Sequence, residues 1–149
     1  MERYDIIIAL KTVLCYGRVI SIYVSEKDWS ISIVIEKDDK KRFKIIGKAS
    51  WRIVNRNNRF VVIGQYDMTY VLEELINNLL CEWVEKEKHI HIQDVSISQM
   101  SDLFVVLSNG FILEVFVSGF EDIEEWRIDD LTINQSICTQ SLKQLIFFG

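Results

Sequence analysis

The stretch that decides the fold covers residues 101–117 and reads SDLFVVLSNGFILEVFV. Two apolar runs, rich in β-branched and aromatic residues, flank the sequence Ser108-Asn109-Gly110. Asn-Gly between such runs is the strongest short-range signal for a β-hairpin, because both residues tolerate a positive φ angle. We therefore expect a hairpin here, within a fold that is rich in antiparallel sheet.

Other segments of the chain alternate between apolar and polar residues, which is the period-two pattern of half-buried strands. Upstream, these segments are 18–25, 29–36, 42–47, 50–54 and 59–64, the last two forming a second hairpin around 55–58. Alternation returns at 89–92 and 95–98, and we expect a last strand at 131–137 and then a short ordered segment ending at Phe148. The first ten residues predict a short amphipathic helix or a strand.

One segment has the period of a helix. Its apolar residues recur at three- and four-residue spacing, which places them on one helical face. They are Leu72, Leu75, Ile76, Leu79, Leu80 and Trp83. The sequence therefore predicts one α+β domain over residues 1–149, with one main amphipathic helix at 69–84. The rest is mostly antiparallel sheet of seven to nine strands, curved or split into two subsheets.

The two halves of the chain share a weak internal repeat. In each half an aspartate precedes a strand, a turn and a second strand follow, and the unit closes on Trp-Arg-Ile, at Trp51 and at Trp126. Duplication of one unit would explain this pattern, and a general likeness among β-meanders is the alternative. The units would cover residues 18–64 and 89–137, joined by the helix 69–84.

Several short sequences carry a resemblance to a known family. They are the SNG turn at 108–110, LEVF at 113–116, EWRI at 125–128, SWRI at 50–53 and IGQYD at 63–67. Together, over residues 17–128, they resemble a family of small bacterial domains, some of whose members are taken to be immunity proteins encoded beside polymorphic toxins. The resemblance implies a fold and a setting, and its motifs carry over no catalytic residue.

Charge is distributed unevenly along the chain. Residues 1–60 contain 13 Lys or Arg and 7 Asp or Glu, whereas residues 61–149 contain 4 and 15, so the halves carry +6 and −11 of the total −5. Such asymmetry can steer a charged partner. An acidic cluster around Trp126, together with Trp29 as an exposed anchor, is the predicted partner-binding surface, and a solvated loop is the alternative. Its acidic members are Glu121, Asp122, Glu124, Glu125, Asp129 and Asp130.

Sites of other kinds are weakly supported. His89 and His91 have a spacing that places both on one face of a strand, but a third metal ligand is not evident. The basic segment 37–59 has too few interleaved aromatic residues to favour nucleic-acid binding. No catalytic triad order or glycine-rich phosphate loop stands out. We expect no catalytic residue, metal or cofactor.

The cysteines and the hydropathy bear on location. Cys15, Cys81 and Cys138 each lie among apolar neighbours, which favours buried, reduced thiols. No stretch approaches the roughly 20 apolar residues that cross a bilayer. We expect a cytoplasmic protein that does not bind membranes.

The function that these features favour is non-enzymatic protein binding. The prediction is an immunity protein that neutralises a cognate basic toxin by covering its active surface with the acidic C-terminal half. One alternative is a homo-oligomeric assembly protein that associates through a sheet edge or an apolar patch. Another is a small-ligand domain, which would require a concave pocket with convergent polar groups.

Overall fold

The computed structural model describes residues 2–48, 50–57, 61–65, 73–118, 124–141 and 144–148. Within them the chain forms two helices and eleven strands, which confirms the α+β class and exceeds the expected seven to nine strands. The elements of the first half are α1 (Arg3–Leu14), β1 (Arg18–Val24), β2 (Ile31–Glu36), β3 (Arg42–Gly47), β4 (Trp51–Asn55) and β5 (Val61–Gly64). Those of the second half are α2 (Glu73–Lys86), β6 (Ile92–Ile97), β7 (Leu103–Leu107), β8 (Phe111–Val115), β9 (Glu124–Asp130), β10 (Gln135–Ser141) and β11 (Gln144–Phe147).

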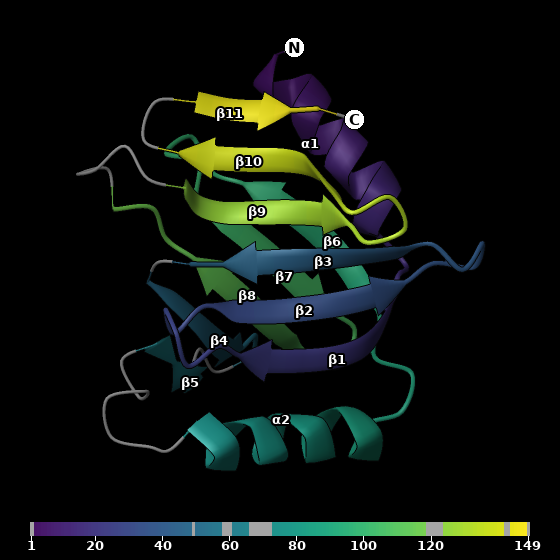
Figure 1. Cartoon of the computed structure of the whole chain (residues 1–149), viewed down its shortest axis with the longest axis vertical. Helices are drawn as coiled ribbons and strands as arrows, with labels where there is room; N and C mark the ends of the chain where they lie inside the picture. Colours follow the sequence, from purple (N-terminus) through teal and green to yellow (C-terminus); the bar gives the residue numbers. More distant parts are fainter. Residues whose placement is uncertain are drawn as a thin grey trace.

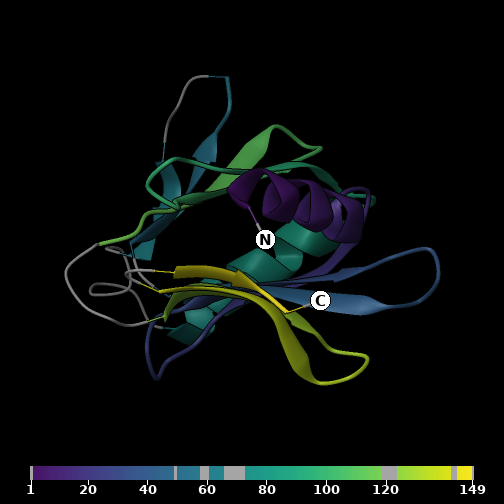
Figure 2. The same ribbon diagram turned by 90° about the horizontal axis from the view of Figure 1, so that it is seen from above.

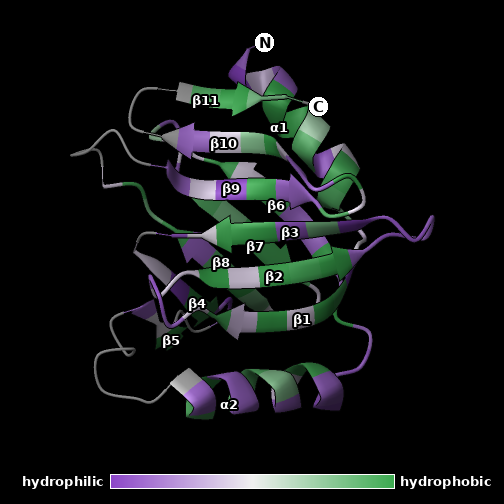
Figure 3. Cartoon of the chain, viewed as in Figure 1, coloured by the Kyte–Doolittle hydropathy of each residue, from purple (hydrophilic) through white to green (hydrophobic). Residues whose placement is uncertain are grey.

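The strands form two antiparallel sheets that face each other (Figure 1). The six-stranded sheet has the order β1-β2-β3-β9-β10-β11, and the five-stranded sheet has the order β5-β4-β8-β7-β6. Figure 3 shows β1 and β2 coloured hydrophobic over most of their length, whereas hydrophilic residues interrupt the hydrophobic ones in β3. The expected split into two subsheets is therefore confirmed.

Most of the expected strands are present. The predicted central hairpin is β7 paired with β8, with Val105 opposite Leu113 and Gly110 at a φ of 90°. The hairpin expected at 50–64 is β4 paired with β5. The strand expected at 131–137 is wrong, because residues 131–134 form a turn in which Asn134 has a positive φ and the Asp130 carboxylate accepts the Thr132 N–H. The strand there is β10, which begins at Gln135.

The strand order of the first half of the chain recurs in the second half. In the first half, α1 precedes the meander β1-β2-β3, and β4 and β5 then join the other sheet. In the second half, α2 precedes the meander β6-β7-β8, and β9 and β10 join the first sheet. Equivalent irregularities occur near the start of β1, between Val19 and Ser21, and of β6, between Ile92 and Asp94. Strands β1 to β5 lie within the predicted unit 18–64, whereas the predicted unit 89–137 ends inside β10, and the origin of the units by duplication stays a prediction.

The first Trp-Arg-Ile sequence begins β4, and the second lies within β9. These are the strands that join the sheet of the other unit. The indole rings of Trp51 and Trp126 are buried. Trp51 Nε1 donates to the carbonyl of Trp29 at 2.7 Å, and Trp126 Nε1 donates to the carbonyl of Ser101 at 2.8 Å. Both acceptor residues have a positive φ, 56° at Trp29 and 72° at Ser101, and both lie between the first two strands of their own unit. Each indole therefore joins a crossing strand to the meander of its unit.

The helices lie at opposite ends of the sandwich (Figure 1), and from above α1 lies between the two sheets (Figure 2). Helix α1 buries Ile6, Leu10 and Leu14 and contacts β6, so the first helix packs on a strand of the second unit. Helix α2 in turn contacts β1 of the first unit. The observed α2 ends at Lys86, two residues beyond the predicted end, and the predicted start at residue 69 falls outside the described residues.

The repeat makes a prediction about stability. Trp51→Phe and Trp126→Phe should each lower the free energy of unfolding by about 2–3 kcal/mol, because each leaves a buried carbonyl without its donor and removes packed volume. Trp83→Phe, at a partly exposed position, should cost about 1 kcal/mol. Urea denaturation monitored by circular dichroism measures all three variants. Equal costs at the three positions would contradict the proposed role of the two buried indoles.

Candidate functional site

The acidic residues of the predicted surface are largely engaged within the fold. Glu121 and Asp122 lie outside the described residues. Glu124 Oε1 lies 2.9 Å from Lys48 Nζ and 3.0 Å from Arg127 Nη1. Asp129 Oδ1 lies 2.9 Å from Arg127 Nε and accepts a hydrogen bond from Ser136 at 2.8 Å. The carboxylates of Glu124 and Asp129 are therefore paired within the fold. Their negative charge is largely neutralised before any basic partner approaches.

Glu125 corrects the predicted surface. Its exposed fraction is 0%, and its carboxylate accepts hydrogen bonds from the backbone N–H and the hydroxyl of Ser118. A buried side chain cannot contact a partner without rearrangement of the fold. Glu125 was wrongly placed on the surface because the sequence did not show that β9 lies in the middle of a sheet, between β3 and β10.

Trp29 also has a structural role. Its side chain is half-buried and packs against the core, and its carbonyl accepts the indole N–H of Trp51. Asp130 remains partly exposed at the end of β9. The structure therefore does not gather the predicted residues into one exposed binding surface within its described part.

Charge reversal at Glu125 and at Asp130 tests whether the first carboxylate is buried and the second is accessible to solvent. Glu125→Lys should lower the free energy of unfolding by about 3 kcal/mol or more, because it buries an ammonium beside the Ser118 N–H donor. Asp130→Lys should change it by less than about 1 kcal/mol. Thermal denaturation of the two variants is the measurement. A Glu125→Lys variant as stable as Asp130→Lys would show that Glu125 is accessible after all.

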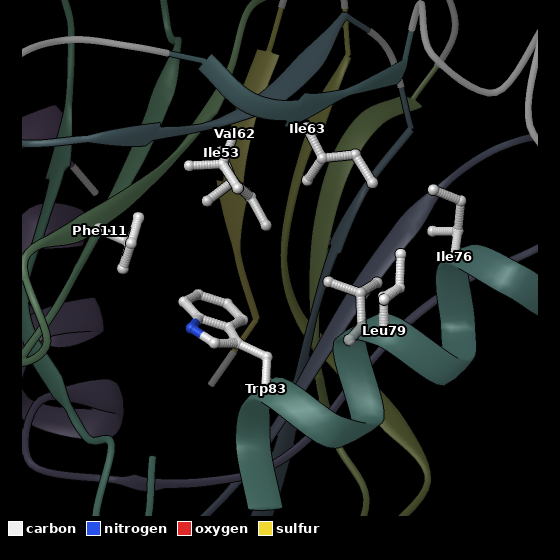
Figure 4. A pocket seen from close by; sticks show the side chains of 8 residues that line it. Ile53, Val62, Ile63, Ile76, Leu79, Trp83 and Phe111 are labelled. Atoms are coloured by element: carbon white, nitrogen blue, oxygen red, sulfur yellow. The ribbon is translucent and has the colours of Figure 1, made fainter. Parts of the chain in front are cut away.

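An apolar groove lies between α2 and the five-stranded sheet (Figure 4). We call it the α2 groove, and its volume is about 340 Å³. It is lined by Ile53, Val62, Ile63, Ile76, Leu79, Leu80, Trp83 and Phe111. In Figure 4 the α2 side chains face those of β4, β5 and β8 across the gap. No residue pair with acid–base or nucleophilic chemistry lines it among the described residues.

Part of the groove wall is exposed to solvent. Val62 is 58% exposed and Leu79 is 55% exposed, while Leu75, one turn before Leu79 on α2, is 53% exposed. Ile76 and Leu80, in contrast, are buried. Exposed apolar side chains gathered around a concavity are typical of interaction sites rather than of ordinary surface.

The apolar stripe that the periodicity predicts for this helix is only partly buried, because Leu75 and Leu79 are exposed. The available signal was the width of the stripe. Adjacent apolar pairs, 75 with 76 and 79 with 80, point about 100° apart on a helix, so one flat sheet cannot cover both members of each pair.

Helix α2 is held firmly at both ends of the groove. The Asn77 side chain accepts the N–H of Val24 at 2.7 Å and donates to the Val24 carbonyl at 3.1 Å, which ties the helix to β1. At the other end, Glu87 accepts hydrogen bonds from Trp83 Nε1 at 3.2 Å and from Asn109 Nδ2 at 2.8 Å. The groove is therefore formed by anchored elements.

Trp83 forms one end of the groove. Its ring meets Phe111 edge to face, with centroids 5.0 Å apart. The indole N–H of Trp83 already donates a hydrogen bond to Glu87, so it is not available to a ligand. The groove thus offers shape and apolar area, with no set of convergent polar groups among its described lining residues.

The histidines and cysteines do not form a metal site. No group of three or more His, Cys, Asp or Glu side chains that could hold an ion occurs in the described part of the chain. Cys15 is half-buried and Cys138 is buried, both as free thiols. Cys81 lies exposed on α2, which corrects the expectation of three buried thiols.

Comparison with protein-family models, with curated proteins and with solved structures gave no match. The family resemblance drawn from the sequence therefore stays a prediction. Separately, neither helix in the described residues has the length and apolar character needed to span a membrane.

The cysteines give a prediction about thiol reactivity. The Glu85 carboxylate raises the pKa of the Cys81 thiol, burial raises the pKa of Cys15, and burial raises the pKa of Cys138 to about 12. Iodoacetamide at about pH 8 should therefore alkylate Cys81 first and Cys138 only after unfolding. Glu85→Gln should accelerate alkylation of Cys81, because it lowers that pKa. Mass spectrometry of timed samples measures each rate, and early alkylation of Cys138 would contradict the packing of β10.

Proposed function

We propose that this chain is a non-enzymatic protein-binding module that acts as an immunity protein. It holds a cognate toxin through the α2 groove and covers the toxin's active surface. The observation that carries the proposal is the exposed apolar wall of Val62 and Leu79, with the exposed Leu75 one turn before Leu79, at a groove built on anchored elements. Covering a surface requires shape complementarity and no catalytic group, which suits the chemistry of this groove.

The chemistry of the groove favours a polypeptide segment over a small molecule. Small-ligand sites combine apolar walls with a few polar groups that fix the orientation of the ligand. Here the indole nitrogen of Trp83 is already bonded to Glu87. Apolar side chains of a partner protein need no such group, because the rest of the partner fixes their orientation.

The charge around α2 suits a basic partner. Glu74, Glu82 and Glu85 are exposed on the helix that forms one wall. Of the three, Glu82 lies about 60° around the helix from Leu79, and its carboxylate would favour a lysine or arginine next to the apolar residues that enter the groove, whereas Glu74 and Glu85 lie on the side of α2 away from the groove. The surface that attracts a basic toxin would then be α2, in place of the acidic cluster on β9.

The proposal predicts the effect of a charge placed in the groove. Leu79→Glu should raise the dissociation constant for the partner by at least about 30-fold, because it places a carboxylate in an apolar interface. The matched control is Ile8→Glu, at an exposed position on α1, which should leave the constant unchanged. The tagged protein is first purified from cells that produce it naturally, and affinities for the recovered partner are then measured by calorimetry.

Capture of a partner is not sufficient, so neutralisation is measured as well. Cells that express the captured partner alone should stop growing, and co-expression of this chain or of Ile8→Glu should restore growth, whereas Leu79→Glu should not. A partner that binds Leu79→Glu as tightly as the unaltered chain would contradict the assignment of the groove. Self-association of the unaltered chain in light scattering, abolished by Leu79→Glu, would replace the toxin with a second copy.

A further inference from the structure

The repeat in strand order breaks at the outer strands. Strands β10 and β5 occupy equivalent places, each beyond the strand that carries Trp-Arg-Ile. The six-stranded sheet continues past β10 to β11, whereas among the described residues the five-stranded sheet ends at β5. Strand β11 therefore shows what packs beside β10, which is the strand equivalent to β5.

Strand β11 packs in an alternating manner. Cys138 of β10 pairs with Phe147, and Gln140 pairs with Leu145. Leu145 and Phe147 are partly buried against the core, whereas Ile146 and Phe148 are exposed. One face of this short strand thus supplies two apolar side chains, two residues apart, to the interior.

The pairing registers show what lies at the equivalent place. Ile128 pairs with Cys138, and Ile53 pairs with Ile63. Because Ile128 and Ile53 are the isoleucines of the two Trp-Arg-Ile sequences, Ile63 is the equivalent of Cys138. Ile63 lines the α2 groove, and Figure 4 shows its side chain pointing toward α2. The groove therefore lies where the inward side chains of an added strand, equivalent to Leu145 and Phe147, would lie.

We propose that the partner enters the α2 groove as an extended segment that lies alongside β5 as an added strand, as β11 lies alongside β10. The segment carries two apolar side chains at positions i and i+2, which fill the groove, and a basic residue that meets the exposed Glu82 of α2. This inference rests on the proposed function and names the form of its ligand. Strand addition to the edge of a sheet is a recurring mode of peptide recognition, in which alternate side chains give specificity.

A set of three peptides tests the alternation. The probe is a synthetic peptide with the sequence KQLIFF, which is that of residues 143–148, with lysines added at its carboxyl end. In the second peptide serine replaces the leucine and the first phenylalanine, which are the inward pair. In the third, serine replaces the isoleucine and the last phenylalanine, the outward pair. Binding to the full chain is followed by the NMR signals of the Trp83 indole N–H and the Ile63 amide.

The probe should shift both signals saturably, and Leu79→Glu should abolish the shifts while Ile8→Glu keeps them. Loss of the inward pair should weaken binding at least about tenfold, and loss of the outward pair less than about threefold. Equal weakening by both changes, or no saturable shift with the probe, would overturn strand addition. Because these peptides need no natural partner, their failure is separate from that of the proposed function, which the partner's affinity for Leu79→Glu decides.

Discussion

Burying two indole rings without leaving their N–H groups unpaired is the constraint on which this two-sheet arrangement depends. Trp51 and Trp126 lie on the strands that leave one unit and enter the sheet of the other. Each finds its acceptor in a loop of its own unit, at a residue whose positive φ turns the carbonyl inward. An unpaired buried N–H would cost roughly 1–3 kcal/mol, so the loops, the crossing strands and the sheets are specified together. The pairing of β3 with β9 and of β4 with β8 follows from this exchange.

Part of the uneven charge along the chain is matched by contacts inside the molecule. Ion pairs join the basic first half to the acidic second half, from Lys11 to Asp94, from Lys48 to Glu124 and from Arg52 to Glu114. Exchange of strands between the units brings these halves into contact along their length. A charge pattern that resembles a docking signal in the sequence can therefore be a contact between two units of one fold. Within the predicted acidic cluster, the ion pair of Glu124 with Lys48 is such a contact.

The sequence indicated local structure well and long-range structure poorly. The hairpin at Asn109-Gly110 and the amphipathic character of α2 follow from turn chemistry and periodicity, which are local properties. The place of β9 inside a sheet, and hence the burial of Glu125, depends on pairing with strands far along the chain. The α2 groove could be anticipated only from the excess width of the helix's apolar stripe, because β5 and Phe111 reach it from other segments. The two Trp-Arg-Ile sequences were a long-range signal, since they mark the two strands that cross between the sheets.

The repeat differs between the two units at their outer strands. Strand β11 covers the edge of β10, whereas apolar side chains beside α2 and β5 are exposed. The most direct test is hydrogen–deuterium exchange of the chain alone and in complex with the partner recovered from its own cells. The account predicts slower exchange on binding in residues 61–65 and in α2, with little change in β9. Slower exchange confined to residues 124–130, with β5 and α2 unchanged, would contradict it and return the binding surface to the acidic cluster.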